Sequence, residues 1–216
     1  MNDELLNILK KVRLLYRKYG IRSVTMDDVS HELGISKKTL YQYVHDKDEL
    51  VHQVIEMEIA DQQGKMMLTC VDQRNAIEQL LEIARCISSM LRDYSAASEY
   101  DLRKYYPDLY MKVRDLRRNH IYHFMVDNLN KGKTEGLYRT EIDVDILSKL
   151  NVSVIDSMVD NEIITITEFM DTRFFNEFFI YHIRGIVNEK GLYYLKEHLN
   201  MLEFRGSSET KSKNYE

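Results

Sequence analysis

Side chains that can read DNA bases lie close together in residues 37–47. If this stretch is helical, successive residues are about 100° apart, so Lys38 and Gln42 point in nearly the same direction. Leu40 and Val44 then share the opposite, inward face. Lysine can donate to O6 and N7 of guanine, and glutamine can pair with adenine through two hydrogen bonds. The pattern favours a major-groove reader, although an ordinary solvated helix face would carry the same residue types.

Two hydroxyl-bearing residues, Thr39 and Tyr41, flank this outward face. Hydroxyl groups of Thr and Tyr bind phosphate oxygens in protein–DNA complexes, and these contacts fix the register of the protein on the duplex. The inward face needs apolar neighbours, which Val29, Leu33 and Ile35 can supply. We therefore expect a small hydrophobic core behind a polar reading surface.

Cap residues predict the elements that would hold this surface in place. Thr25 and Asp28 have the spacing of a capping box, which predicts a short helix that ends at Leu33. Gly34 suits a tight turn, because glycine adopts positive φ without steric cost. Two short helices joined through a glycine and a cap have the form of a helix-turn-helix.

Cap residues and apolar spacing also predict the helices before and after this pair. Ser36 can cap the helix that carries Lys38 and Gln42, here called the reading helix, which we expect to end near His45. Asp46 with Glu49 can cap a long helix that extends toward residue 70. A helix before them is predicted to stop at Gly20. Its apolar residues recur at helical spacing: Leu5, Ile8, Leu9, Val12, Leu15 and Tyr19.

The charge distribution supports a DNA-binding head. The whole chain of 216 residues has a net charge of −5. Residues 10–47 hold nine basic and four acidic side chains, so this segment carries +5 and the remainder −10. A basic head on an acidic body fits a phosphate-binding module attached to a part that does not bind DNA.

The run from Thr25 to Leu50 resembles the N-terminal domain of TetR-family repressors. That family has a Thr that caps the second helix, a Leu/Ala-Gly-Val/Ile-Ser turn, then Leu-Tyr-x-His/Tyr-Phe and Lys-x-x-Leu. The matching segments here are Thr25, Leu33-Gly34-Ile35-Ser36, Leu40-Tyr41-Gln42-Tyr43-Val44 and Lys47-Asp48-Glu49-Leu50. The resemblance covers about 45 residues. Val44 replaces the commoner Phe, and residues 30–33 are less Ala-rich than usual, but neither departure changes the expected role.

The resemblance implies DNA contacts, position by position. The positions that look like phosphate contacts are Thr25, Tyr43 and Lys47. Those that look like the groove-facing set are Lys37, Lys38, Thr39, Tyr41 and Gln42. Gly34 is implied to be a turn residue without a DNA contact, and His45 could be either a contact or a solvated loop residue.

The rest of the chain is also predicted to be helical, so the expected fold class is all-α. Apolar stripes mark a helix over 77–94, a helix that starts at Pro107, a loop over 131–136 and a helix over 144–161 that Asp143 caps. We expect a three-helix DNA-binding domain over 1–48, a helical regulatory and dimerisation domain over 49–204, and a disordered tail over 205–216.

A helix over 172–188 is apolar around more than half of its circumference, so one protein surface cannot cover it. We expect this helix and the one over 144–161 to pair with a second copy of the chain. The alternative is that both pack only on the core of their own chain. A homodimer agrees with the family resemblance, which implies dimers with a small-molecule pocket in the C-terminal helices.

The implied pocket would lie between the helices at 73–94, 107–131 and 144–161. Residues 105–139 also look like the regulatory domains of some TetR members. Met and aromatic side chains form adaptable walls for apolar ligands, but each of them could equally be an ordinary core residue. The candidate ligand-binding residues are Met90, Tyr94, Tyr110, Phe124, Met125 and Met158. No fixed charge in this region indicates the class of the effector.

Other kinds of chemistry find little support. Cys70 and Cys86 are expected to be reduced and buried, and with His120, His123 and His182 they show no ligand spacing of a metal site. We therefore predict no metal and no cofactor. No apolar run approaches the roughly 18 residues of a membrane span, so we expect a cytoplasmic protein without membrane contact.

These observations together predict a DNA-binding transcriptional regulator, a ligand-responsive repressor that binds a palindromic operator as a homodimer. Two other classes stay open at this point. One is an interaction protein that keeps the fold but no longer binds DNA. The other is a helical enzyme with a fortuitous helix-turn-helix, although the sequence shows no catalytic motif.

Overall fold

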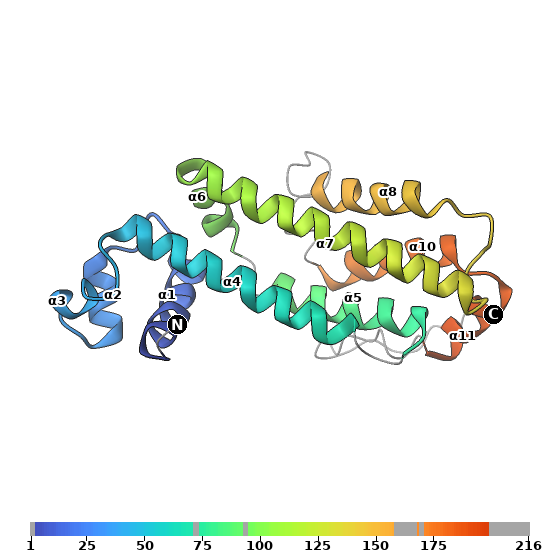
Figure 1. Cartoon of the computed structure of the whole chain (residues 1–216), viewed down its shortest axis with the longest axis horizontal. Coiled ribbons are helices and arrows are strands. Elements are labelled where there is room, and N and C mark those ends of the chain that lie inside the picture. Colours follow the sequence, from blue (N-terminus) through green and yellow to red (C-terminus); the bar gives the residue numbers. More distant parts are fainter. Residues whose placement is uncertain (1–2, 71–73, 93–94, 158–167, 169–170, 199–216) are drawn as a thin grey trace. The chain divides into compact units, whose positions relative to one another are not determined.

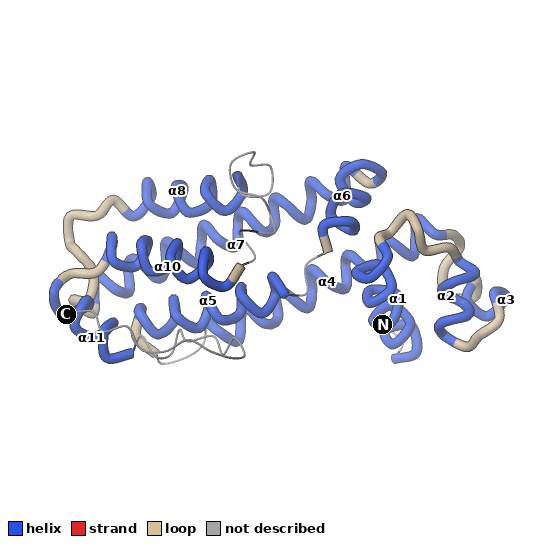
Figure 2. Tube along the Cα trace, turned by 180° about the vertical axis from the view of Figure 1, so that it is seen from behind, coloured by secondary structure: helices blue, strands red, loops and turns tan. Residues whose placement is uncertain are grey.

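The structure is a computed structural model that describes residues 3–70, 74–92, 95–157, 168 and 171–198, without the side chains of 62–70, 88–92, 172 and 175. In these ranges the regular structure is α-helical, as Figure 2 shows. Within the described ranges, one isolated β-bridge joins Tyr138 and Val187. The all-α prediction is confirmed. None of the described helices is long and apolar enough to cross a membrane.

The chain forms two compact units. The first unit comprises Met1–Asp72 and Arg92–Phe124, and the second comprises Gln73–Leu91 and Met125–Glu216. Helices of the first unit are α1 (Asp3–Tyr19), α2 (Met26–Leu33), α3 (Lys37–Leu40), α4 (Lys47–Cys70), α6 (Ala96–Tyr105) and the start of α7 (Pro107–Thr134) (Figure 1). Helices of the second unit are α5 (Ala76–Arg92), the rest of α7, α8 (Val144–Ser157), α10 (Thr172–Ile186) and α11 (Glu189–His198).

Helix α1 is the central element of the first unit, where it packs on α2, α4 and α6. The predicted apolar stripe is confirmed at Ile8, Leu9, Val12 and Leu15, which are all buried. The assignment of Tyr19 to this stripe is wrong, because Tyr19 is 52% exposed while Tyr16 is buried. Tyr16 lies four residues after Val12 and continues the buried face, whereas Tyr19 sits in the last turn and lies beside the Lys18 ammonium.

Helix α7 starts at Pro107 as predicted but continues to Thr134, into the segment 131–136 that was expected to be a loop. Gly136 follows the end of the helix and has φ of 65°. The amide of Gly136 donates to the carbonyl of Lys133, and the amide of Leu137 to that of Gly132. This pair of bonds is a Schellman motif, which needs a left-handed residue and so selects glycine.

Gly132 stays in the helix because the ring of Tyr138 packs onto it. A Cβ at Gly132 would lie 2.1 Å from Cδ2 of Tyr138. The tyrosine is fully buried, and its hydroxyl donates to the Asn128 side chain at 2.9 Å. Tertiary packing therefore overrides the low helix propensity of this glycine.

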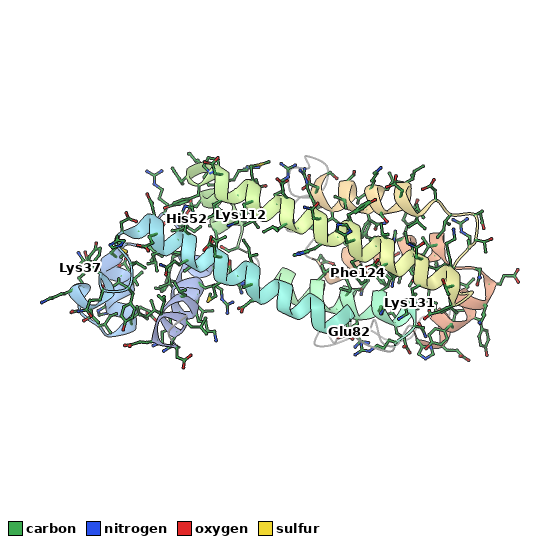
Figure 3. The ribbon with its side chains drawn as sticks, in the orientation of Figure 1. Lys37, His52, Glu82, Lys112, Phe124 and Lys131 are labelled. Carbon is green, nitrogen blue, oxygen red and sulfur yellow. The ribbon has the colours of Figure 1, made fainter. Side chains whose placement is uncertain are left out.

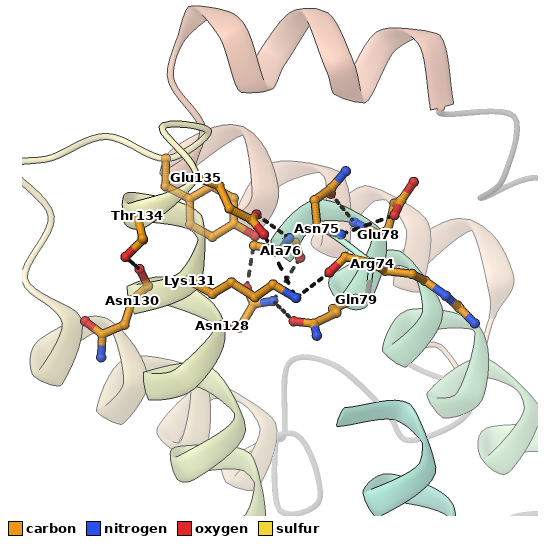
Figure 4. A network of polar contacts seen from close by, with 11 residues as sticks. Arg74, Asn75, Ala76, Glu78, Gln79, Asn128, Asn130, Lys131, Thr134 and Glu135 are labelled. Carbon is orange, nitrogen blue, oxygen red and sulfur yellow. Dashed lines mark hydrogen bonds and ion pairs between the residues drawn. The ribbon is translucent and has the colours of Figure 1, made fainter. Parts of the chain in front are cut away.

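A polar network joins the start of α5 to the end of α7 in the second unit (Figure 4). The Asn128 amide donates to the carbonyl of Ala76 at 2.8 Å, and the Ala76 amide donates to the Glu135 carboxylate at 2.8 Å. Lys131 donates to the carbonyl of Arg74. Unpaired backbone groups at a helix start are costly when buried, so these side chains stabilise the junction.

Two described helices were not expected. Helix α6 fills the region between the predicted stripes, and α11 follows α10. The predicted helix over 172–188 agrees with α10, while residues 158–161 of the predicted helix over 144–161 lie outside the described residues. Cys86 forms no disulfide and is half-buried, not fully buried as expected, and the side chain of Cys70 is not described.

Replacing Gly132 tests the packing of Tyr138. Gly132→Ala should lower the free energy of unfolding by about 1–3 kcal/mol, because the new methyl group overpacks the buried ring. Gly185→Ala is the matched control within α10, since its Cβ meets no atom within 4 Å. This control should leave stability unchanged or raise it by up to about 1 kcal/mol. Chemical denaturation measures both, and an equal change in the two variants would contradict the packing argument.

Candidate nucleic-acid interface

Helix α2 begins with the predicted capping box. The Thr25 hydroxyl oxygen accepts a hydrogen bond from the Asp28 amide at 3.2 Å, and the Asp28 carboxylate accepts one from the Thr25 amide at 2.8 Å. The Thr25 hydroxyl also donates to this carboxylate, and these bonds hold the pKa of Asp28 below its usual value. The start of α2 is therefore fixed by its own residues.

The turn between α2 and α3 depends on Gly34, which has φ of 68°. Its amide donates to the carbonyl of His31 and the amide of Ile35 donates to that of Ser30, both at 3.1 Å. Ser36 follows in an extended conformation and caps α3, where its hydroxyl oxygen accepts from the Thr39 amide at 3.0 Å. The predicted glycine turn and serine cap are both confirmed.

Helix α3 is shorter than predicted. It spans Lys37–Leu40 and gives way to a turn, instead of continuing to about His45. The amide of Gln42 donates to the carbonyl of Thr39, and the amide of Tyr43 to that of Leu40. Such bonds over three residues tighten the end of a helix, and they begin here after a single regular turn.

The two faces of the reading segment are nevertheless as predicted. Leu40 and Val44 are buried, at 0% and 2% exposed, and belong to one core with Val29. Leu33 and Ile35 pack against this core. The outward side chains of Lys38, Tyr41 and Gln42 are exposed. A one-turn helix can present its polar side chains in a fixed direction only because the opposite face is anchored in this way.

Within the groove-facing set, the side chains differ in their partners. Lys38 and Gln42 make no hydrogen bond or ion pair with the described residues, so their donors are available to bases. The Thr39 hydroxyl shares a hydrogen bond with the Ser36 hydroxyl at 2.8 Å. Lys37, labelled in Figure 3, forms an exposed ion pair with Asp27 at 2.6 Å, which raises the pKa of this lysine.

The expected phosphate contacts are partly engaged inside the protein. Tyr43 is hydrogen-bonded to Glu4, which raises the pKa of the tyrosine. The Lys47 ammonium donates to the carbonyl of Arg22 at 3.0 Å, and partial burial lowers the pKa of this lysine. Lys47 thus ties the start of α4 to the α1–α2 loop.

Helix α4 begins with the predicted cap at Asp46 and with a second local bond that was not predicted. The Asp46 carboxylate accepts from the Glu49 amide at 2.8 Å, and the Glu49 carboxylate accepts from the His45 amide at 2.6 Å. His45 itself is exposed. The chain therefore leaves the reading segment in a defined direction.

Sequence reasoning missed the contribution of α6. The Asp101 carboxylate is buried and accepts from the Arg22 amide at 2.8 Å. The Ser98 hydroxyl donates to the carbonyl of Tyr16, and the Tyr106 hydroxyl donates to Asp48 at 2.9 Å. Ser95, which caps α6, is a local sign of this helix, but its contacts with the head could not be predicted because they bridge more than 50 residues.

The candidate ligand-binding residues lie in different surroundings. Tyr110 is buried in the core of the first unit, Phe124 is half-buried in the same unit, and Met125 is buried in the second unit. The side chains of Met90, Tyr94 and Met158 lie outside the described residues. An effector pocket lined by these residues stays a prediction.

The interior of the second unit contains buried polar atoms without hydrogen-bond partners among the described residues. These atoms are Oγ of Ser148, Oδ1 of Asn176 and Nε2 of His182. Burial lowers the pKa of His182, so its imidazole is neutral at pH 7. In the described part of the chain, no three His, Cys, Asp or Glu side chains converge as a metal site would require.

Residues 8–54 match the sequence profile of a family described as bacterial regulatory proteins, tetR family. This matched segment contains the capping box, the glycine turn and the reading helix described above. Over these residues the chain is similar to the TetR family. Regulators that carry this segment bind DNA and are not enzymes, so residues 8–54 are those of a DNA-binding regulator.

Known proteins resemble the chain over most of its length. An uncharacterised HTH-type transcriptional regulator of Bacillus subtilis, YvaF, is 26% identical over 156 residues, which is 72% of this chain and 80% of that protein. A transcriptional regulator from Cytophaga hutchinsonii has a similar fold, with a TM-score of 0.69 and 18% identity over 87% of this chain and all of its own.

Two further solved structures share the fold and contain a bound partner. A putative regulator from Saccharomonospora viridis in complex with choline gives a TM-score of 0.67 at 16% identity, over 88% of this chain and all of its own. The protein CprB from Streptomyces coelicolor, in complex with its operator sequence, gives 0.60 at 16% identity, over 93% of this chain and 98% of its own.

The Ser36 cap can be tested directly. Ser36→Ala should destabilise the reading segment by about 1 kcal/mol, because the Thr39 amide loses its acceptor. Affinity for DNA should fall by roughly fivefold if the whole of this free energy is lost from binding. Ser36→Thr retains the hydroxyl and should restore most of the affinity. Fluorescence anisotropy with a labelled duplex measures both, and equal losses in the two variants would exclude capping as the cause.

Proposed function

We propose that the chain is a cytoplasmic, homodimeric repressor that binds a palindromic operator and releases it when a small molecule binds. The observation that carries this proposal is the reading segment. Lys38 and Gln42 are exposed and have no partner among the described side chains, while Leu40 and Val44 anchor the opposite face. These two outward residues have the donors and acceptors needed for guanine and adenine edges.

A dimer is supported by the length of α3. One helical turn can contact too few bases to select a site in a genome, so a second head on a neighbouring half-site is needed. Most closed protein dimers are two-fold symmetric, and the operator of such a dimer is a palindrome. We therefore assign one half-site to each copy of the chain.

The surface of α8 supports the same conclusion. Ile146 and Leu150 are 55% and 53% exposed, whereas Ser148 is fully buried and Asn151 is nearly so. On α10, Tyr181 is 81% exposed. Apolar side chains on the outside and polar ones on the inside are unfavourable for an isolated surface helix. A second copy packed on α8 and α10 would remove this apolar surface from water.

The unpaired polar atoms of the second unit support a small-molecule effector. Ser148, Asn176 and the neutral His182 present hydrogen-bonding groups in the interior that lack partners in the described residues. Buried groups of this kind are costly unless a ligand or water satisfies them. One protein of the same fold was solved in complex with choline, so a helical protein of this type can bind a small molecule.

Release from the operator is assigned to α4. This helix starts at Lys47, immediately after the reading segment, and extends to Cys70. A ligand that binds one state of the dimer better than the other shifts the population toward that state. We propose that the ligand-bound state separates the two heads by a distance that no longer matches the half-sites.

Selection of bound duplexes from a randomised DNA pool, repeated at two salt concentrations, tests the proposal as a whole. Recovery of a palindromic motif supports both sequence-specific binding and a two-fold dimer. A motif without two-fold symmetry would contradict the dimer on DNA. Failure to enrich any sequence at low salt, from protein freed of bound small molecules by unfolding and refolding, would favour an interaction protein that does not bind DNA.

Two substitutions separate base reading from backbone contact. Gln42→Ala should relax the preference at one base pair, at a cost of about 1–3 kcal/mol against the preferred base. Lys47→Ala should weaken binding to all sequences and reduce the slope of log affinity against log salt by about 1. Binding measured across single-base variants of the selected motif distinguishes the two, and identical profiles would show that the faces are misassigned.

The proposed dimer surface can be tested by introducing one charged side chain into it. Leu150→Lys should shift the protein from dimer to monomer in sedimentation experiments, because a buried ammonium without a partner is strongly unfavourable. Tyr193→Lys is the control, since Tyr193 is 66% exposed on α11, outside the proposed surface. A Leu150→Lys protein that stays dimeric would move the interface away from α8.

A further inference from the structure

Four exposed side chains form a row on the first unit, here called the basic–aromatic patch: Arg22, Tyr100, Lys104 and Tyr105. The Arg22 guanidinium lies over the Tyr105 ring, 4.7 Å from its centre, and donates to the Tyr105 hydroxyl. The Lys104 ammonium lies 5.4 Å from the centre of the Tyr105 ring and 5.2 Å from that of Tyr100. It also donates to the Tyr100 hydroxyl at 2.9 Å.

The two cations of this patch are held by aromatic rings, not by carboxylates. Neither Arg22 nor Lys104 forms an ion pair with any side chain in the described ranges. Other exposed basic residues in this unit do, including Lys37 with Asp27 and Lys112 with Glu56. Stacking on a ring orders a cation without cancelling its charge, so the patch keeps two positioned positive charges.

Two carboxylates in this part of the first unit accept hydrogen bonds from donors of the protein itself. Asp101 accepts from the Arg22 backbone amide, and Asp48 accepts from the Tyr106 hydroxyl. The first bond joins α6 to the α1–α2 loop, and the second joins the end of α6 to the start of α4. The cationic groups of Arg22 and Lys104 are left for a partner outside the chain.

The tyrosines add a second property to the patch. Tyr100 is 50% exposed and Tyr105 is 37% exposed, so both rings are accessible to a partner. Their hydroxyl groups can donate to phosphate oxygens, and their rings can lie against sugars. Exposed cations together with tyrosines suit a sugar–phosphate backbone better than they suit an apolar partner.

The patch adjoins the DNA-binding segment. Arg22 lies in the loop that leads to Thr25, the first residue expected to contact phosphate, and the Lys47 ammonium is bonded to the Arg22 carbonyl. Tyr100, Lys104 and Tyr105 come from α6 and its end, outside residues 8–54 that match the family profile. The patch therefore extends the basic head with residues from a later part of the chain.

We propose that the basic–aromatic patch binds the phosphodiester backbone of operator DNA, on the flank of the base pairs read from α3. Lys104 and Arg22 neutralise phosphates there, and the tyrosine hydroxyls donate to the same oxygens. The contact adds affinity without base preference. This inference rests on the operator binding proposed above and assigns a separate part of that interface.

Lys104→Ala tests the patch with two duplexes, one that carries the selected motif with long flanks and one trimmed to the motif. On the long duplex, the slope of log affinity against log salt should fall by about 0.9 for each phosphate that the lysine neutralises. On the trimmed duplex, wild type and variant should bind alike, because the flanking phosphates are missing. Lys104→Arg should restore the slope on the long duplex.

Lys196→Ala, on α11 of the second unit, controls for the removal of one positive charge and should change neither slope. An unchanged slope for Lys104→Ala on the long duplex would show that the patch does not bind the DNA backbone, and would favour an acidic protein as its partner. An equal loss of affinity on both duplexes would also overturn the proposal, since Lys104 would then act through the position of α6. If wild type bound neither duplex, the operator-binding proposal itself would fail, and the patch with it.

Discussion

A reading helix of one turn cannot persist by itself, and the rest of the DNA-binding head is organised around this constraint. Forming the first turn of a helix fixes several backbone angles for a single hydrogen bond, so Lys37–Leu40 has no stability of its own. The left-handed Gly34 and the Ser36 cap set where it begins. Leu40 and Val44 then hold its inward face in the core. The direction of Lys38 and Gln42 is a consequence of these supports.

The same head depends on residues far along the chain. The α1–α2 loop runs across the surface, and both backbone groups of Arg22 are satisfied by side chains: its amide by Asp101 and its carbonyl by Lys47. Asp101 belongs to α6, 79 residues later. Helix α6 is thus part of the DNA-binding unit in structure although not in sequence. A change in the position of α6 would act directly on the loop that precedes α2.

The features that sequence analysis predicted correctly are those that neighbouring residues determine: the capping box at Thr25, the turn at Gly34, the caps at Ser36 and Asp46, and the buried face of α3. The errors arose where side-chain packing outside the local helix pattern determines the structure. Gly132 stays helical because Tyr138 covers it, and Lys47 binds Arg22 because the loop lies beside α4. The domain boundary at residue 48 and the effector pocket stay predictions.

Helix α8 has a pattern of side chains that is unfavourable in the chain taken alone, because apolar residues lie outside and a polar residue lies inside. Each half-exposed leucine or isoleucine forgoes about 1 kcal/mol of burial, while a buried hydroxyl without a partner adds a further cost. Ile146 and Leu150 are exposed and Ser148 is buried without a described partner. If a second copy covers the two apolar residues and a ligand or water reaches Ser148, both costs disappear together. Dimerisation and effector binding would then stabilise opposite faces of one helix, so that each could affect the other through α8 itself.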